Sequence, residues 1–311
     1  LVVLLFVSRL VQGAGGATTG IVQAYIGDAI VAEERTKALG WISAATNAGV
    51  MLGPVLGSLA ALLGPSAPGL AASLLCFVNL LFTWKWLPES HHDREHHPDR
   101  PRASVRKRLW SVATEPTQPV ARLIWIYAVG MMAFMALNAV LALFLQARFG
   151  VTEKTFGYFY AYIGTVSLVM RSLILGPTVR RLGEIRVLRL GLVSLALGFL
   201  LLSFAPSVPV FVVVLLLIPI GTALLFPATT SLVTRFGSRS DLGATMGVQQ
   251  AFGGVARFLG PIWAGAAVEL LAPGAPLWIA SGLTLAALAF ATGLRPQEPA
   301  VAAPPETARA G

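Results

Sequence analysis

The stretch from residue 187 to residue 232 reads VLRLGLVSLALGFLLLSFAPSVPVFVVVLLLIPIGTALLFPATTSL. It contains two apolar runs, 187–205 and 208–232, and Arg189 is its only charged residue. As a helix, each run is long enough to cross a hydrocarbon layer about 30 Å thick. The stretch therefore predicts two consecutive membrane-spanning helices whose side chains face mostly lipid.

The same pattern continues along the chain in both directions. Of the 311 residues, 56% are hydrophobic and 12% are charged, whereas about a quarter of residues are ionic in ordinary soluble domains. The candidate spans are 1–26, 41–63, 67–87, 121–146, 156–178, 187–205, 208–232, 244–268 and 274–294. We therefore expect an all-α, polytopic membrane bundle with about nine transmembrane helices present.

Positive charges alternate from one connection to the next. Sixteen Lys and Arg residues fall in connections on one predicted side, and two, Arg148 and Lys154, fall on the other. Because Lys and Arg accumulate in cytoplasmic loops, the first side and the C-terminus are predicted to be cytoplasmic. We expect a multi-pass protein of the inner (plasma) membrane. The net charge of +9 then reflects topology and predicts no nucleic-acid partner.

An internal repeat indicates how the spans are organised. Leu39-Gly40 and Leu52-Gly53-Pro54 recur as Met246-Gly247 and Leu259-Gly260-Pro261, at a common offset of 207 residues (247 − 40 and 260 − 53). The first three spans thus correspond to the last three, as in carriers built from two six-helix halves. The simplest completion adds three helices before Leu1.

This repeat predicts four regions. They are 1–87 (three helices of the N-terminal half), 88–120 (a cytoplasmic inter-domain loop), 121–294 (a complete C-terminal half) and 295–311 (a disordered, Pro/Ala-rich tail). The alternative for the start is a signal peptide cleaved near the small residues 14–17. That alternative is disfavoured because Arg9 interrupts the apolar run and no basic segment precedes it.

The first functional motif is RLVQGAGGA at 9–17. On a helix, one stripe carries Arg9, Gln12, Gly16, Thr19 and Gln23. An arginine inside a span costs at least about 2.5 kcal/mol unless it faces a partner or a wet cavity, so a functional role is expected. The alternative is that Arg9 snorkels to the outer interface.

The second motif is a spacing of small residues in the second span. Gly40, Gly49, Gly53-Pro54 and Gly57-Ser58 follow one another, and the last three glycines recur every four residues. Such a face lets a neighbouring helix approach closely, and Pro54 frees a carbonyl and bends the helix. Ordinary tight packing is the alternative to a specialised role.

The third motif, GPTVRRLGE at 176–184, lies between the fifth and sixth spans. With the other two motifs it resembles signatures of the major facilitator superfamily, and within it those of the twelve-span drug/proton antiporters, including the tetracycline efflux group. The chain would then hold helices four to twelve. The third motif resembles a degenerate second-half copy of the family's Gly-x-Leu-Ala-Asp-Arg-x-Gly-Arg loop, with Arg180 in place of Asp and Glu184 in place of the later Arg.

The resemblance also implies roles for individual residues. Arg9 matches the arginine that the family assigns to proton transfer. The small-residue face matches the antiporter signature, with Ser58 in place of its last glycine. Asp28 resembles part of a charge latch at the inner end of the first span, and a solvated loop cluster is the alternative for it.

In this family the first and fourth helices of each half line the central cavity. The resemblance and the polar residues of the spans imply cavity or substrate positions at Gln12, Thr19, Gln23, Tyr127, Met131, Met135, Asn138, Arg171, Thr222, Gln250 and Arg257. Met offers a soft, adaptable wall and Asn a hydrogen bond. Helix packing is the alternative for the methionine stripe.

We therefore expect a monomeric secondary transporter that exports small amphipathic compounds or drugs, including antibiotics, with protons as the coupling ion. A permease for a sugar, amino acid or other metabolite and a transport-inactive fragment are the alternatives. All fourteen Asp and Glu residues fall in loops or at span ends, so no buried carboxylate suggests itself for coupling. No nucleotide-binding signature is present and the histidines at 91–97 lie in a polar loop, so we expect no enzyme activity, cofactor or metal.

Overall fold

The computed structural model describes residues 66–88, 105–237 and 242–294 continuously, and scattered residues between 22 and 64. The elements are α4 (Ala67–Trp86), α5 (Val105–Thr114), α6 (Pro119–Phe149), α7 (Glu153–Val169), η2 (Met170–Ile174), α8 (Leu175–Leu182), α9 (Glu184–Phe204), α10 (Val208–Leu215), α11 (Leu217–Phe236), α12 (Leu242–Leu270) and α13 (Ala275–Ala291). All are helical, η2 being a π-helical turn. The predicted all-α fold is confirmed.

The described helices match seven of the nine predicted spans. By length and composition, six stretches can cross a membrane: Ala67–Trp86, Pro119–Phe149, Thr155–Leu182, Glu184–Phe204, Val208–Phe236 and Ala244–Leu270. The apolar helix Ala275–Ala291 is shorter and matches the last predicted span. The predicted spans 1–26 and 41–63 lie largely outside the described residues. The protein is a multi-pass membrane protein.

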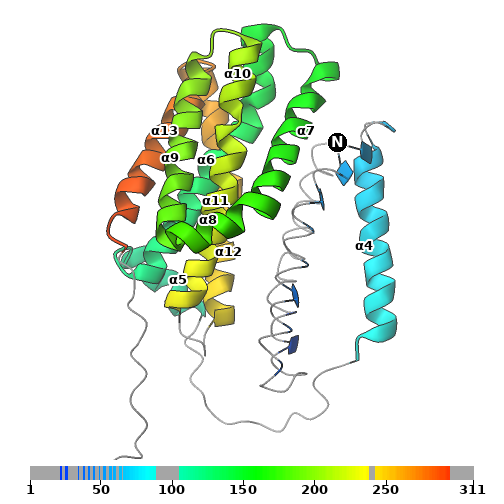
Figure 1. Ribbon diagram of the computed structural model, residues 1–311, viewed down its shortest axis with the longest axis vertical. Coiled ribbons are helices and arrows are strands. Elements are labelled where there is room, and N and C mark those ends of the chain that lie inside the picture. Colours follow the sequence, from blue (N-terminus) through cyan, green and yellow to red (C-terminus); the bar gives the residue numbers. More distant parts are fainter. Residues whose placement is uncertain are drawn as a thin grey trace, which may run out of the picture.

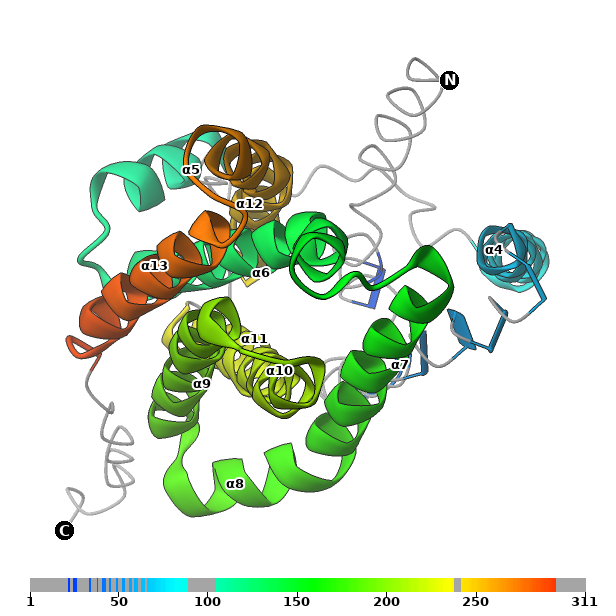
Figure 2. The same ribbon diagram turned by 90° about the horizontal axis from the view of Figure 1, so that it is seen from above.

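Helix α6 is the central element of a bundle formed by α6 to α13. It packs against α12, α13 and α11, while α9 packs against α11 and α13. Figures 1 and 2 show these helices gathered together and α4 standing apart from them. The described side chains of α4 are unburied.

The core of the bundle is apolar and rich in leucine and phenylalanine. Leu123, Ile124 and Ile126 of α6 are fully buried. The ring of Phe211 in α10 lies 5.9 Å from that of Phe144 and 6.1 Å from that of Phe159. These two ring contacts of Phe211 join α10 to α6 and α7 near one end of the bundle.

Glycines bring α9 and α11 into backbone contact. A Cβ added at Gly191 would lie 2.8 Å from the backbone nitrogen of Leu225 and 3.0 Å from the carbonyl oxygen of Gly221. No side chain can yield there, because both neighbours are backbone atoms. In lipid, where helices gain little from the hydrophobic effect, such close approach is a main source of association.

A second close contact joins α12 to α6. A Cβ at Gly260 would lie 2.8 Å from Met135 Cβ and 3.0 Å from the carbonyl oxygen of Met132. One turn away on either side, Ala256 and Ala264 are also buried. At the offset of 207, Ala256, Gly260 and Ala264 correspond to Gly49, Gly53 and Gly57. The repeat therefore relates the predicted small-residue face to one that packs tightly in this structure.

The 88–120 region contains a helix in addition to loop. Helix α5 packs against α6 and α12, and Trp125 Nε1 donates a hydrogen bond to the Val112 carbonyl at 2.9 Å. Arg108 donates to Thr245 Oγ1 at 3.1 Å. Among the described side chains of α5, only Val112 is buried.

The predicted fifth span changes direction before it ends. It runs through α7, the π-helical turn η2 and α8, and Figure 2 shows α8 crossing sideways between α7 and α9. Hydropathy predicted a span over 156–178 followed by a loop, whereas the helix continues to Leu182. A π-helical turn admits an extra residue into the helix and is a known cause of bends.

Two arginines bind carbonyl groups at the ends of neighbouring helices. Arg189 Nη2 donates to the carbonyls of Ala291 at 3.1 Å, Thr292 at 3.2 Å and Leu294 at 3.0 Å. Arg148 Nε donates to the Ala205 carbonyl at 3.1 Å. Cations are favourable at helix C-termini, where carbonyls lack intrahelical partners. These contacts fasten the ends of α13 and α9.

The close contact between α9 and α11 at Gly191 can be tested by adding a methyl group there. We expect Gly191→Ala to destabilise the bundle by about 1–3 kcal/mol, the usual cost of overpacking a tight core. The thermal midpoint of the purified protein should fall. Gly282→Ala is the matched control, because a Cβ at this exposed helical glycine meets nothing within 4 Å. Equal midpoints for the two variants would contradict the packing described.

Candidate functional site

Part of the predicted site lies outside the described residues. These positions are Arg9, Gln12, Thr19, Gln23, Asp28, Gly40 and Pro54, and their roles stay predictions. Gly49, Gly53 and Gly57 are described, and a Cβ at any of them would meet nothing within 4 Å. Most residues around these three glycines lie outside the described part of the chain, so the packing role of this face also stays a prediction.

Arg257 and Tyr127 are brought together by the packing of α12 on α6. Arg257 is exposed, and its Nη2 lies 3.5 Å from the Tyr127 hydroxyl oxygen, to which it can donate a long hydrogen bond. Tyr127 is only 6% exposed, and its ring meets that of Phe226 edge-on at 5.4 Å. A cation thus lies at the edge of an aromatic group formed by three helices.

The predicted methionine stripe borders this pair. Tyr127 and Met131 are buried with Ala128 and Ala256, and the partly buried Met132, Met135, Phe226 and Phe252 pack against them. Part of the stripe therefore packs α6 against α12, as the alternative interpretation held. The partly buried Met135 lies against the buried group that includes Tyr127.

Two predicted polar positions have their hydrogen bonds satisfied locally. Asn138 Nδ2 donates to the Phe134 carbonyl at 2.9 Å, and the backbone carbonyl of Asn138 accepts from the Tyr160 hydroxyl at 3.3 Å. Thr222, 4% exposed, donates to the Pro219 carbonyl at 3.2 Å. The hydroxyl proton of Thr222 and one amide proton of Asn138 are thus engaged by neighbouring backbone carbonyls.

The two glutamines of α12 differ in accessibility. Gln250 is exposed. Gln249 is 1% exposed and donates from Nε2 to Thr230 Oγ1 at 3.1 Å, which links α12 to α11. Gln250 and Arg257 are seven residues apart and so share one face of the helix. Gly254, between them, would meet nothing within 4 Å if it carried a Cβ.

Sequence reasoning missed Phe252 and Thr230. Phe252 packs its ring against Trp125 of α6 at 5.3 Å and belongs to the group around Tyr127. Neither residue lies on a polar stripe, so no sequence signal marked them. Their role depends on which helices are neighbours.

Arg171 occupies the π-helical turn η2. It follows the buried Met170 and is itself half-buried. Its Nε is buried and has no hydrogen-bond partner. The structure does not place Arg171 in the group around Tyr127.

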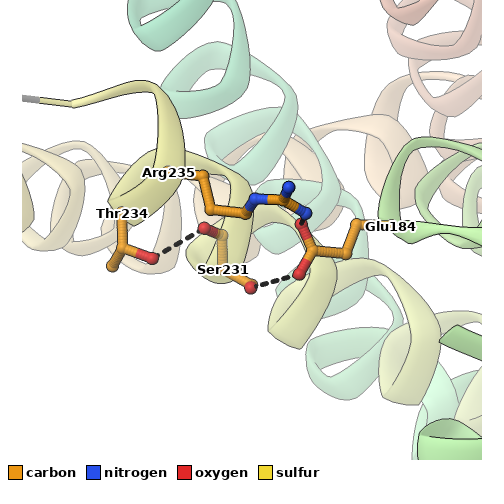
Figure 3. A network of polar contacts seen from close by, with 4 residues as sticks. All are labelled: Glu184, Ser231, Thr234 and Arg235. Atoms are coloured by element: carbon orange, nitrogen blue, oxygen red, sulfur yellow. Dashed lines mark hydrogen bonds and ion pairs between the residues drawn. The ribbon is translucent and has the colours of Figure 1, made fainter. Parts of the chain in front are cut away.

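The third motif takes part in a polar network at one end of the bundle (Figure 3), the end predicted to face the cytoplasm. Gly183, with φ of 78°, precedes α9. Glu184 accepts a hydrogen bond from Ser231 Oγ at 2.6 Å and pairs with Arg235 at 3.1 Å. Thr234 Oγ1 donates to the Ser231 carbonyl at 2.7 Å. Glu184, which replaces an arginine of the family pattern, thus connects α9 to α11.

Shallow hollows on the described surface lie elsewhere. One is lined by Leu81, Trp84, Lys85 and Trp86 of α4, and another by side chains of α6 and α12 with Pro273. Neither borders Arg257 or Arg171. The group around Tyr127 is itself buried, with the exposed Arg257 at its edge.

Comparisons with known proteins agree with this architecture. A family model described as Major Facilitator Superfamily matches residues 1–186 and 172–311. The tetracycline resistance protein, class C, of Escherichia coli is 28% identical over 261 residues, which cover 83% of this chain and 65% of that protein. Multidrug resistance protein 2 of Bacillus subtilis (strain 168) is 26% identical over 272 residues, covering 85% and 66%.

A solved structure is also similar. The human organic anion transporter MFSD10 (TETRAN) superposes with a TM-score of 0.69 at 26% identity, over 92% of this chain and 70% of that one. The tetracycline resistance proteins of classes C and B are covered over 65% and 64% of their lengths. The chain thus spans about two thirds of the curated relatives it matches.

The strength of the ion pair between Glu184 and Arg235 can be measured by mutation. A double-mutant cycle with Glu184→Ala and Arg235→Ala should give a coupling free energy of about 0.2–1 kcal/mol, measured by denaturation of the purified protein. The value is small because the Arg235 side chain is 67% exposed and solvent screens the pair. A coupling above about 3 kcal/mol would mean that the pair is shielded from water, contrary to this geometry.

Proposed function

The chain belongs to the major facilitator superfamily, and on that premise we propose that it serves the export of small amphipathic compounds by alternating access. Proteins of this family are transporters and not enzymes, in agreement with the expectation from the sequence. Rocking of two related halves about a central site is the general mechanism of such carriers. Because the chain covers about 65% of its relatives, the activity of a whole carrier is carried over as a proposal.

The names of the relatives support export of drugs. Tetracycline resistance proteins and multidrug resistance proteins match over more than four fifths of this chain, at 24–28% identity. Resistance by a membrane carrier is achieved by moving the drug out of the cell. We therefore take tetracycline as the first compound to test, with antibiotic resistance as the expected consequence.

The observation that carries the proposal is the face around Arg257. The exposed guanidinium lies beside the Tyr127 hydroxyl, and Phe226, Met132 and Met135 pack against the buried group to which Tyr127 belongs. An amphipathic compound can place its polar group at the guanidinium and its apolar body against methionine and aromatic side chains. Methionine adapts to ligands of different shapes, which suits a transporter of several compounds.

Proton coupling is proposed from the resemblance of residues 9–17 to the antiporter motif. Arg9 is the residue assigned to proton transfer, with Asp28 at the inner end of the same span. The acidic residues of the continuously described ranges lie at helix ends or outside helices, namely Glu115, Glu153, Glu184 and Glu269. A facilitator for a metabolite, without proton coupling, is the second candidate, because no carboxylate lies inside a described span.

We further propose that the protein is a monomer in the inner (plasma) membrane with a cytoplasmic C-terminus. The larger number of Lys and Arg residues in the connections on one predicted side supports this orientation. Arg180, Arg181 and Arg235 lie at the predicted inner end, and Arg148 lies at the opposite end. Short loops on the cytoplasmic side of a membrane carry an excess of Lys and Arg.

Transport by the purified chain in proteoliposomes tests the proposal. A pH-sensitive dye inside the vesicles should report proton movement that begins when tetracycline is added and scales with its uptake. Tetracycline uptake without proton movement would favour the facilitator. Absence of tetracycline uptake would contradict the proposed export of such compounds.

Variants of the Arg257 face provide the third prediction. Arg257→Gln should lower tetracycline uptake about tenfold or more, since hydrogen bonds to charged groups contribute about 1.5–3 kcal/mol. Arg186→Gln, an exposed position at the start of α9, is the matched control and should transport normally. If both variants transport like the unmodified chain, the Arg257 face does not bind the compound.

A further inference from the structure

Arg171 is isolated in an apolar segment. Between Lys154 and Arg180 it is the only charged residue of the sequence. Its neighbours Val169, Leu173 and Ile174 are exposed apolar side chains of a candidate span. Charged side chains in such segments are costly and usually face a partner, a water-filled cavity or a ligand.

The helix is locally widened at Arg171. Residues Met170–Ile174 form a π-helical turn, and the Leu175 amide donates to the Met170 carbonyl across it. The neighbouring Ser172 hydroxyl donates its hydrogen bond to the Leu168 carbonyl at 2.7 Å and makes none with Arg171. Single π-helical turns inside α-helices occur frequently at functional sites.

The other half-buried arginines of the described bundle each have a contact for the guanidinium, although the Nε atoms of Arg108 and Arg122 are, like that of Arg171, buried without a hydrogen-bond partner. Arg108 donates to Thr245, and Arg189 binds the carbonyls at the end of α13. Arg122 lies over the ring of Phe290 at 5.0 Å. Among the described residues, Arg171 makes no hydrogen bond or ion pair, and its Nε is buried without a partner.

Among the residues that the structure describes, no carboxylate pairs with Arg171. None of its Asp and Glu residues lies within a predicted span. The nearest acidic residues in the described helix pair are Glu153, at the start of α7, and Glu184, which is engaged by Ser231 and Arg235. Within the described part of the chain, the charge on Arg171 is therefore available to an anion from outside it.

We propose that the Arg171 guanidinium binds an anionic oxygen group, such as a carboxylate, of the transported compound. The inference rests on the proposed function in taking this anion from the compound carried. A guanidinium presents two parallel N–H donors to the two oxygens of a carboxylate. The apolar side chains on either side of Arg171 suit the apolar part of an amphipathic anion. The π-helical turn would then carry the residue that selects organic anions over neutral compounds.

Binding of a matched pair of probes tests the proposal. The full chain in phosphatidylcholine nanodiscs is titrated calorimetrically with 1-naphthoate and with its neutral amide, 1-naphthamide. Naphthoate should bind at least about tenfold more tightly. Arg171→Met should abolish that preference, Arg171→Lys should keep part of it, and Arg180→Met, an exposed arginine of α8, should keep all of it.

Each other outcome has a defined meaning. No binding of naphthoate, or a preference that survives in Arg171→Met, overturns the proposal. Loss of naphthoate binding when phosphatidylglycerol replaces phosphatidylcholine assigns the site to a lipid headgroup and also overturns it. The thermal midpoint of Arg171→Met without ligand should equal or exceed that of the unmodified chain, since an unpaired charge is removed. A lower midpoint would reveal a counter-ion in the protein and contradict the inference.

The two proposals fail separately. Tetracycline uptake by vesicles in which naphthoate shows no preference over naphthamide leaves export standing and removes the anion site. Naphthoate binding that depends on Arg171, without tetracycline uptake, leaves the site standing and removes the proposed export of that compound.

Discussion

Close contact between helix backbones is the constraint on which this bundle depends. Apolar side chains gain little by leaving lipid for protein, so association relies on dispersion contacts and interhelical hydrogen bonds. Gly191 and Gly221 bring α9 against α11, and Gly260 brings α12 against α6. A methyl group at these points would meet backbone atoms. The crossings so fixed determine which polar residues become neighbours, including Tyr127 and Arg257.

The same lipid environment explains how the charges are distributed. Arg189 and Arg148 use unpaired carbonyls at helix ends, and Glu184 pairs with Arg235 at the predicted inner end. These contacts satisfy backbone and side-chain groups without placing a free ion in the hydrocarbon layer. Arg257 and Arg171 depart from this arrangement, the first being exposed and the second unpartnered. Departures of this kind are where binding is expected.

Hydropathy and charge predicted most of the fold, and much less of the site. Apolar runs located seven described spans within a few residues, because crossing a bilayer imposes their length. Helix α5 was missed because its sequence is polar, and the turn at Arg171 because π-helical geometry follows from packing, not from composition. Met131 and Thr222 were selected by periodicity, yet both are buried. The pairing of Tyr127 with Arg257 required knowing that α6 and α12 cross.

Cysteine labelling of the two ends of the bundle tests the membrane arrangement most directly. Thr152→Cys, between α6 and α7, and Arg181→Cys, in α8, are exposed positions that can be introduced separately into a Cys76→Ser background. In intact cells, a membrane-impermeant maleimide should label Thr152→Cys at once and Arg181→Cys only after permeabilisation. Equal labelling of both cysteines before permeabilisation would place them on one side of the membrane and contradict the proposed topology.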